Sequence, residues 1–156
     1  MKILNLGSGD MGRQEGMTNV DIRPLPNVDV VADVKKLPFK DGEVDGIINR
    51  NLIEHFGRHE TKELLQEWVR VLKTGGFMRI ETVDMGRLMD RWREIPEENM
   101  LDGILGAQTY NENFHKMVFT RNILERFLTE AGMEVKEVNQ NIQREIPRII
   151  IICVKK

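Results

Sequence analysis

Seven short apolar runs rich in Val and Ile recur along this chain, and each is flanked by Gly, Pro, Asn or Asp. Short runs of this composition, closed by turn-forming residues, are typical of β-strands. We expect strands at residues 2–6, 18–22, 28–34, 44–49, 76–83, 133–138 and 148–154. Seven strands of this length place a sheet at the centre of the fold.

Helical periodicity is found between the later strands. In residues 60–72 the side chains of Leu64, Leu65 and Trp68 recur at helical spacing with charges between them, and Gly75 follows as a stop signal. We expect helices at residues 60–72, 85–93, 99–106 and 120–131. Strands that alternate with helices predict an α/β fold with a mostly parallel sheet. The closeness of the last two strands predicts an antiparallel hairpin at one edge.

The first two connections, residues 7–17 and 23–27, are too short for the helices that normally link parallel strands. The chain also begins at its first strand, so we expect no earlier helix to replace them. Residues 149–152 are nevertheless apolar without alternation, as in strands buried on both faces. We therefore expect a sheet shortened on one face, and a homodimer that covers that face.

Composition limits the class of protein further. The 156 residues are enough for one domain, residues 1–156, and 40% hydrophobic with 31% charged residues is a globular balance. The net charge of −2 gives no general affinity for nucleic acid, and no apolar run approaches the roughly 20 residues that span a bilayer. Cys153 is the sole cysteine, which excludes an intrachain disulfide. We expect a cytoplasmic protein without nucleic-acid or membrane partners.

A glycine loop, Gly7-Ser8-Gly9, directly follows the first strand. Glycine there allows a sharp turn and the close approach of a ligand. Residues 7–12 also match the dinucleotide pattern G-x-G-x-x-G, but residues 13–17 leave no room for the helix that would face a pyrophosphate. Asp10 would moreover place a negative charge beside the phosphates. An NAD- or nucleotide-dependent enzyme is therefore the less favoured alternative.

Two carboxylates follow the next two strands at equivalent positions. Asp21 closes the second strand and Asp33 closes the third. The carboxyl ends of parallel strands are where ligands bind in open α/β sheets, and a carboxylate there accepts hydrogen bonds from a ribose diol or an adenine amino group. The loop and the two acids together predict a site for an adenosine-containing ligand.

These residues resemble successive motifs of the class I S-adenosylmethionine-dependent methyltransferases, most closely compact members of the type 11 group. The resemblance runs over residues 3–9, 19–21, 32–39, 45–56 and 68–80, and covers most of residues 3–138. It includes Glu-His-Phe at 54–56 and Arg-Val-Leu-Lys-Thr-Gly-Gly at 70–76. It implies a Rossmann-like, seven-stranded, mostly parallel sheet with one reversed strand, and S-adenosylmethionine as cofactor. Asn5 departs from the family, which usually has an acidic residue there.

The resemblance also implies a set of cofactor-binding residues. The loop would line the methionine part, Asp21 would bind the ribose, Ile22 would pack on the adenine, and Asp33 with Val34 would contact its edge. Two residues that end the fourth strand would border the sulfonium. The complete expected set is Asn5, Gly7, Ser8, Gly9, Asp21, Ile22, Asp33, Val34, Asn49 and Arg50.

Methyl transfer needs a base only where the acceptor is a weak nucleophile such as a hydroxyl. The candidate bases are His115, His55 and Asp84, and His115 is preferred because it resembles a His-Lys-x-x-Phe segment of related compact methyltransferases. His55 and His59 have the spacing of a helical metal pair, but Gly57 interrupts them and no third ligand is evident. We expect no metal.

The function that the sequence favours is methyl transfer from S-adenosylmethionine to a small-molecule or saccharide-like acceptor. The alternative is a non-catalytic S-adenosylmethionine-binding or assembly protein, which Asn5 and the shortened scaffold keep open.

Overall fold

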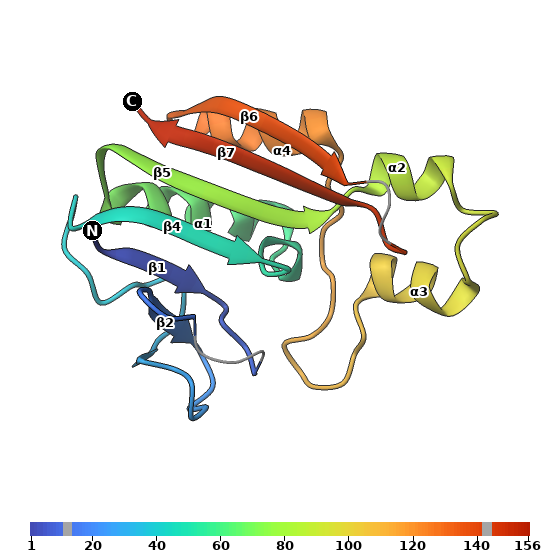
Figure 1. Ribbon diagram of the computed structural model, residues 1–156, viewed down its shortest axis with the longest axis horizontal. Coiled ribbons are helices and arrows are strands. Elements are labelled where there is room, and N and C mark those ends of the chain that lie inside the picture. The colour runs from blue at the N-terminus through green and yellow to red at the C-terminus, as the bar shows by residue number, and fades with distance from the viewer. Residues whose placement is uncertain (11–13, 142–144) are drawn as a thin grey trace.

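The computed structural model describes residues 1–10, 14–141 and 145–156, and its seven strands form one sheet in the order β3-β2-β1-β4-β5-β7-β6 (Figure 1). All seven expected strands are present. Their bounds are β1 Ile3–Leu6, β2 Thr18–Asp21, β3 Val30–Val31, β4 Val44–Arg50, β5 Leu72–Val83, β6 Met133–Asn141 and β7 Arg148–Lys155.

The strand directions are those of the expected mixed sheet. The strands β1 to β5 pair in parallel, with Leu4 opposite Ile47 in the centre. The strand β7 runs antiparallel to both of its neighbours, β5 and β6, so it is the one reversed strand. The β6–β7 hairpin at the sheet edge is also confirmed.

Four α-helices follow the expected order, with bounds α1 Arg58–Val71, α2 Met85–Asp90, α3 Glu97–Leu105 and α4 Arg121–Glu130, and a short 3-10 turn η1 spans Ile53–His55. The stripe Leu64, Leu65 and Trp68 is completely buried. Thr120 caps α4, since its hydroxyl accepts the Ile123 N–H at 3.4 Å. Periodicity and capping therefore located these helices to within a few residues.

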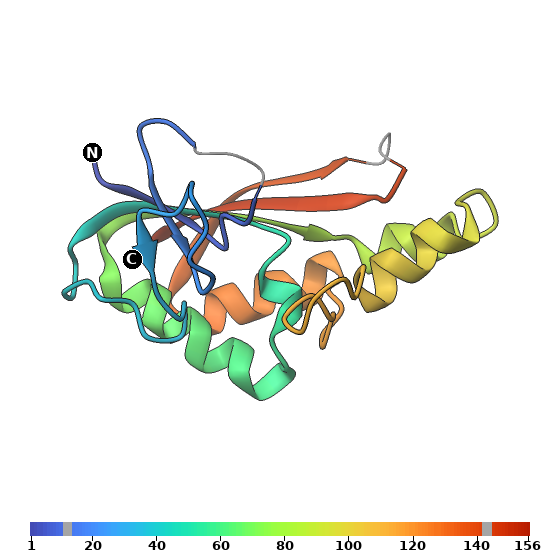
Figure 2. The ribbon, with the colours of Figure 1, turned by 90° about the horizontal axis from the view of Figure 1, so that it is seen from below.

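All helices that the structure describes lie on one side of the sheet (Figure 2). The side chains of Leu6, Ile47, Met78 and Ile151 point to this side and are completely buried under α1 and α4. In residues 1–10, 14–141 and 145–156 no helix covers the opposite side. The expected shortening on one face is thus confirmed.

Side-chain hydrogen bonds replace the missing crossover helices. The Asn19 backbone N–H donates to the Asp29 carboxylate at 2.8 Å, and the Asn27 amide donates to the Gly9 carbonyl at 2.6 Å. Asp33 accepts the Lys35 N–H at 2.9 Å in a tight turn. Strand β3 has two residues rather than the expected seven, because Asp29 bonds to β2 through its side chain and Asp33 begins this turn.

Helices α2 and α3 form a hairpin that extends from the end of the sheet (Figure 1). A second, smaller apolar cluster of Val83, Leu88 and Ile95 anchors it to β5. Among the helices of the described residues, none is both long enough and apolar enough to traverse a bilayer.

Trp68→Phe is expected to lower the free energy of unfolding by about 2–4 kcal/mol. The Trp68 indole is completely buried, and its N–H donates to the Val34 carbonyl at 3.1 Å. The substitution leaves a cavity and an unpaired buried carbonyl. Urea unfolding followed by circular dichroism measures the change. The matched control Trp92→Phe alters a half-exposed side chain and should change stability little; equal effects of the two substitutions would contradict this account.

Candidate functional site

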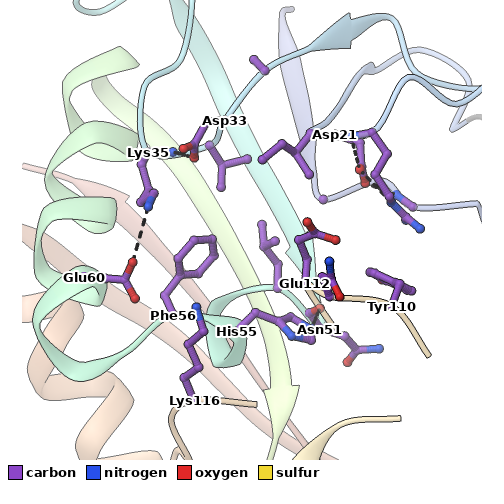
Figure 3. Close-up of a pocket in the computed structure, with 18 residues that line it drawn as sticks. Asp21, Asp33, Lys35, Asn51, His55, Phe56, Glu60, Tyr110, Glu112 and Lys116 are labelled. Atoms are coloured by element: carbon purple, nitrogen blue, oxygen red, sulfur yellow. Dashed lines mark hydrogen bonds and ion pairs between the residues drawn. The ribbon is translucent and has the colours of Figure 1, made fainter. Parts of the chain in front are cut away.

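A cleft of 390 Å³ opens at the carboxyl ends of β1, β2 and β3 and at the loop after β4 (Figure 3). Its other wall comes from residues 110–116, far away in the sequence. The lining residues are Gly7, Gly9, Asp21, Ile22, Arg23, Ala32, Asp33, Val34, Lys35, Asn51, Leu52, His55, Phe56, Glu60, Tyr110, Asn111, Glu112 and Lys116. This is the edge of the sheet at which ligands bind in α/β proteins.

The glycine loop forms the floor of the cleft. Gly7 and Gly9 have φ angles of 64° and 60°, a region that favours glycine. A Cβ on Gly7 would lie 2.7 Å from the Leu52 side chain, so a larger residue would displace the cleft wall. The Ser8 N–H donates to the Val20 carbonyl at 3.1 Å, which fixes the loop against β2.

Asp21 is the buried carboxylate of the cleft. One oxygen accepts the Gly9 N–H at 2.8 Å, and the other accepts the Arg23 N–H at 2.9 Å and the Arg23 Nε–H at 3.3 Å. The Arg23 guanidinium also lies 4.3 Å from the centre of the Tyr110 ring. Asp21 therefore sets the loop position, and through Arg23 it connects the loop to the opposite wall.

Apolar and charged side chains alternate at the other end of the cleft. Ile22, about half exposed, and Val34, which is buried, are both apolar residues of the lining. Lys35 and Glu60 form an ion pair at 3.4 Å across the cleft (Figure 3). Glu60 also accepts the Gly57 N–H at 3.0 Å at the start of α1, so this helix positions the pair.

His55 lies on the cleft wall, but its ring nitrogens face the protein. Nδ1 lies 3.1 Å from the Phe114 carbonyl, and Nε2 lies 3.1 Å from the Asn51 carbonyl. Burial lowers the pKa of the His55 ring, which favours the neutral form. Each ring nitrogen faces a backbone carbonyl, and the neutral ring carries one N–H that donates to one of them, so the His55 ring packs between the loop after β4 and the opposite wall.

The other two candidate bases lie outside the cleft lining. His115 packs edge-on against His55, with 5.1 Å between ring centres, and its Nδ1 lies 3.1 Å from the Gly103 carbonyl. Burial, followed by the nearby His55, lowers the pKa of His115. Asp84 caps α2 and accepts the Gln140 amide at 2.5 Å. A role as base for any of the three stays a prediction.

The structure brings six of the ten expected cofactor residues to the cleft. The four that do not line it are Asn5, Ser8, Asn49 and Arg50. Asn5 and Arg50 lie on the helix-free face, where Asn5 bonds to Asn19 and Arg50 approaches Glu81. Asn49 points toward the helices and is completely buried. Alternation along β1 and β4 is the reason, since each strand turns successive side chains to opposite faces.

The border of the cleft is Asn51 and Leu52 instead, because β4 continues to Arg50, one residue beyond its expected end. Asn51 has a φ of 50°, which turns the chain out of the sheet. Sequence reasoning also missed Phe56 and, in the opposite wall, the lining residues Tyr110, Asn111, Glu112 and Lys116, although it had chosen His115 from this segment as a candidate base. For Asn51, a more accurate strand end was the available signal. In the wall, the His-Lys-x-x-Phe segment that begins at His115 was a signal for Lys116, and residues 110–112 have no motif.

Glu54 is a buried carboxyl group behind the cleft. Neither side-chain oxygen has a hydrogen-bond partner among the described residues, and burial raises its pKa to about 7. Its backbone carbonyl accepts the Lys116 and Met117 N–H groups at 2.9 and 3.2 Å. The residue thus supports the wall that contains Lys116.

Within the described ranges, no group of three or more His, Cys, Asp and Glu residues could hold an ion.

Comparison with known proteins identifies related folds. A family model described as a methyltransferase domain matches residues 13–80, just under half of the chain. No curated protein has a sequence that matches. The Burkholderia thailandensis 1,6-didemethyltoxoflavin-N1-methyltransferase, solved with 1,6-didemethyltoxoflavin and S-adenosylhomocysteine, is 14% identical with a TM-score of 0.72. The match covers 99% of this chain and 71% of that one.

Two further solved structures share the fold. A Methanosarcina mazei SAM-dependent methyltransferase is 18% identical with a TM-score of 0.71, over 99% of this chain and 92% of that one. A chain in the complex between the Haloferax volcanii Trm112 methyltransferase activator and a methyltransferase is 15% identical with a TM-score of 0.68, over 98% and 81%. At these identities the likeness establishes the fold.

Glu54→Gln is expected to remove part of the pH dependence of stability. The pKa of about 7 in the folded protein lies above the ordinary 4.5, so the stabilisation from Glu54 is complete below pH 4.5 and is lost as the pH rises through 7. The loss is on the order of 3 kcal/mol, because each pH unit is worth about 1.4 kcal/mol. The amide stays neutral, so the variant should be the more stable protein at alkaline pH.

Urea unfolding of both proteins at about pH 5 and about pH 8 measures this difference. Glu98→Gln, on the exposed side of α3, is the control and should follow the wild type at both values. The account fails if Glu54→Gln and the wild type lose stability equally with rising pH.

Proposed function

We propose that this chain, whose fold is that of the class I S-adenosylmethionine-dependent methyltransferases, binds S-adenosylmethionine in the cleft and transfers its methyl group to a small-molecule acceptor. The resemblance in the sequence to this class is confirmed by the methyltransferase-domain match and by the seven-stranded sheet with one reversed strand. The family match and the solved structures agree in indicating S-adenosylmethionine as the cofactor.

The observation that carries the proposal is the buried Asp21 carboxylate at the end of β2, beside the glycine loop. The residues present fit the cofactor. The loop offers backbone without side chains, Asp21 offers acceptors for a ribose diol, and Ile22 and Val34 offer apolar surface for a flat ring. Asp33, exposed at the end of β3, can accept from an adenine amino group.

Asp21 would exchange one partner for another on binding. A carboxylate has about four acceptor positions, and Gly9 and Arg23 already fill three. A diol that forms two hydrogen bonds displaces the Arg23 Nε–H, the longest of the three. The Gly9 contact is kept, so the loop stays in place.

When bound, S-adenosylmethionine supplies an electrophilic methyl group on a sulfonium. The chain's own task is to orient donor and acceptor in line and to exclude water. Tyr110, Glu112 and Lys116 supply the wall opposite the glycine loop, and Glu112 lies centrally among the labelled side chains (Figure 3). A polar acceptor would be oriented by these groups.

We include a small acceptor, which covers saccharide-like molecules, in the proposal because the acceptor would share this cleft with the cofactor. The volume of 390 Å³ is near the lower end of the ~300–1,000 Å³ of small-molecule pockets. The same wall restricts access by a large substrate. We place the protein in the cytoplasm as a single domain of residues 1–156 on the sequence argument alone.

One observation favours the alternative of a non-catalytic binding protein. Both nitrogens of His55 face backbone carbonyls, and His115 and Asp84 lie off the cleft lining, so none of the expected bases presents a nitrogen or oxygen to the cleft directly. A nucleophilic acceptor such as an amine needs no strong base. We therefore prefer the methyltransferase to the non-catalytic binding protein. Methyl transfer to a panel of small amines, hydroxyls and thiols separates the two.

Asp21→Ala is expected to weaken S-adenosylhomocysteine binding by roughly 10²-fold or more. The substitution removes two charge-assisted hydrogen bonds to the ribose and the contact that holds Gly9. Asp33→Ala removes one exposed hydrogen bond and should cost roughly tenfold. Titration calorimetry on folded proteins measures both values. If the wild type binds S-adenosylhomocysteine and Asp21→Ala binds it with the same affinity, the assignment of Asp21 to the ribose is wrong.

For a hydroxyl acceptor, His115→Ala is expected to slow turnover by about 10²–10⁴-fold with cofactor affinity retained. Glu112→Gln tests the acidic group that lines the cleft in the same assay. Single-turnover rates measure both. A rate unchanged in His115→Ala but lowered in Glu112→Gln would transfer the role of base to Glu112.

A further inference from the structure

A second, smaller pocket of 80 Å³ adjoins the cleft on the helix-free side of the glycine loop, and we call it the loop pocket. Gly7 lines both cavities, and Arg50 in the loop pocket directly precedes Asn51 on the border of the cleft. A molecule bound in the cleft is therefore next to the loop pocket. The described residues that line it are Asn5, Gly7, Ser8, Gln14, Met17, Ile48 and Arg50.

The lining of the loop pocket combines apolar, neutral polar and cationic side chains. Met17 and Ile48 are apolar and partly buried, and Asn5 and Gln14 carry neutral amides. The Ser8 hydroxyl is buried and has no hydrogen-bond partner among the described residues. Of the described residues that line the pocket, none is acidic. The pocket therefore offers hydrogen-bond donors and no carboxylate of its own.

Arg50 brings a positive charge to the loop pocket that the chain neutralises only in part. Its Nε lies 3.9 Å from a carboxylate oxygen of Glu81, too far for a hydrogen bond, and its side chain is 55% exposed. Arg79 donates a hydrogen bond of 2.9 Å to the same oxygen. Two guanidinium groups therefore share one carboxylate, and the guanidinium at the loop pocket is the less firmly paired of the two.

Position 5 decides whether Arg50 has a charged partner inside the pocket. An acidic side chain there would place a negative charge in the same lining as the Arg50 guanidinium and would compete with an anionic ligand. The Asn5 amide is neutral, and its Nδ2 donates to the Asn19 side-chain oxygen at 2.9 Å. The departure of this sequence from its family at position 5 thus keeps Arg50 free for a ligand.

We propose that the loop pocket binds a carboxylate group of the methyl acceptor, with Arg50 as its counter-ion. A guanidinium presents parallel N–H groups at the spacing of the two carboxylate oxygens, and Met17 and Ile48 suit a short carbon chain that carries the acid. The substrate class is a small carboxylic acid. This inference rests on the proposed function, since the reacting end of the acceptor lies in the cleft beside the cofactor.

The carboxylate of the cofactor itself suits the loop pocket less well. In S-adenosylmethionine a carboxylate and an ammonium group are attached to the same carbon, so a guanidinium that attracts the one repels the other. The described lining offers no acidic side chain to the ammonium group. An acid without a neighbouring ammonium group meets no such repulsion. The same argument disfavours free amino acids as acceptors.

Butanoate and its neutral counterpart butanamide test the site in wild-type protein saturated with S-adenosylhomocysteine. At constant ionic strength, butanoate should shift the NMR signals of the Ser8 and Arg50 amides with a Kd of about 1–20 mM. Butanamide should bind at least about tenfold more weakly, because it lacks the charge. Equal binding of the acid and the amide overturns the proposal, and this comparison needs no variant.

Arg50→Gln should weaken butanoate binding by at least about tenfold, and Arg50→Lys, which keeps the charge, should weaken it less. Arg126→Gln is the matched control, because Arg126 is also exposed and its Nε also lies 3.9 Å from a carboxylate oxygen, that of Glu130. The control should bind butanoate like the wild type. Circular dichroism confirms that each variant is folded. If Arg50→Gln and Arg126→Gln bind butanoate equally well, Arg50 is not the counter-ion and the proposal is wrong.

Calorimetry with S-adenosylhomocysteine separates this inference from the proposed function. Wild type and Arg50→Gln should bind S-adenosylhomocysteine with affinities within about threefold of each other, whereas a loss of about tenfold or more assigns the carboxylate to the cofactor and overturns the acceptor class. If the wild type binds S-adenosylhomocysteine but not butanoate, the loop pocket proposal alone fails. If it binds no S-adenosylhomocysteine, the proposed function fails and the acceptor assignment fails with it.

Methyl transfer completes the test of the substrate class. In a panel of small acids that carry an amine, hydroxyl or thiol remote from the carboxylate, each acid should have a kcat/KM at least about tenfold above that of its amide. Arg50→Gln should raise KM for the acids and leave KM for the amides unchanged. Amides that react as well as the acids overturn the proposal.

Discussion

The shortness of the two connections that join β1 to β2 and β2 to β3 is the constraint on which the rest of the structure depends. Without crossover helices, side chains must close these turns, and Asn19, Asn27 and Asp29 do so through hydrogen bonds to backbone groups. The same shortness leaves one face of the sheet without helices. Asp21 is one of the links that hold the glycine loop, because it accepts the Gly9 N–H and connects the loop to Arg23 on the cleft lining.

Most of the fold could be predicted from the sequence because its signals are local. Short Val- and Ile-rich runs bounded by turn residues located all seven strands, and Thr120 with its following stripe located α4. Strand β3 was the exception. Residues 28–34 are apolar enough for a long strand, but the Asp29 carboxylate accepts the Asn19 backbone N–H and Asp33 starts a turn. These are competing hydrogen bonds, which composition does not reveal.

The cleft was predictable where the chain follows a motif and not where it depends on tertiary contact. Gly7, Gly9, Asp21 and Asp33 line it as expected, since each follows the end of a strand. Asn49 and Arg50 do not line it because β4 continues to Arg50, so both residues are still in the strand and their side chains alternate between its two faces. The wall with Tyr110 reaches the cleft only through its contacts with Arg23, His55 and Glu54, partners 55 or more residues away in the chain.

The position of the reversed strand has a consequence for how the chain acquires its structure. Strand β5 lies inside the sheet, yet its partner β7 is encoded about 70 residues later, with Ile80 opposite Ile151. During folding, the long apolar edge of β5 must wait for that partner, and helices α2 to α4 lie between the two strands in the chain. Such non-local pairing slows folding and exposes a strand edge to other chains. The kinetic vulnerability of this protein therefore lies at the centre of its sheet, where the finished molecule is most completely buried.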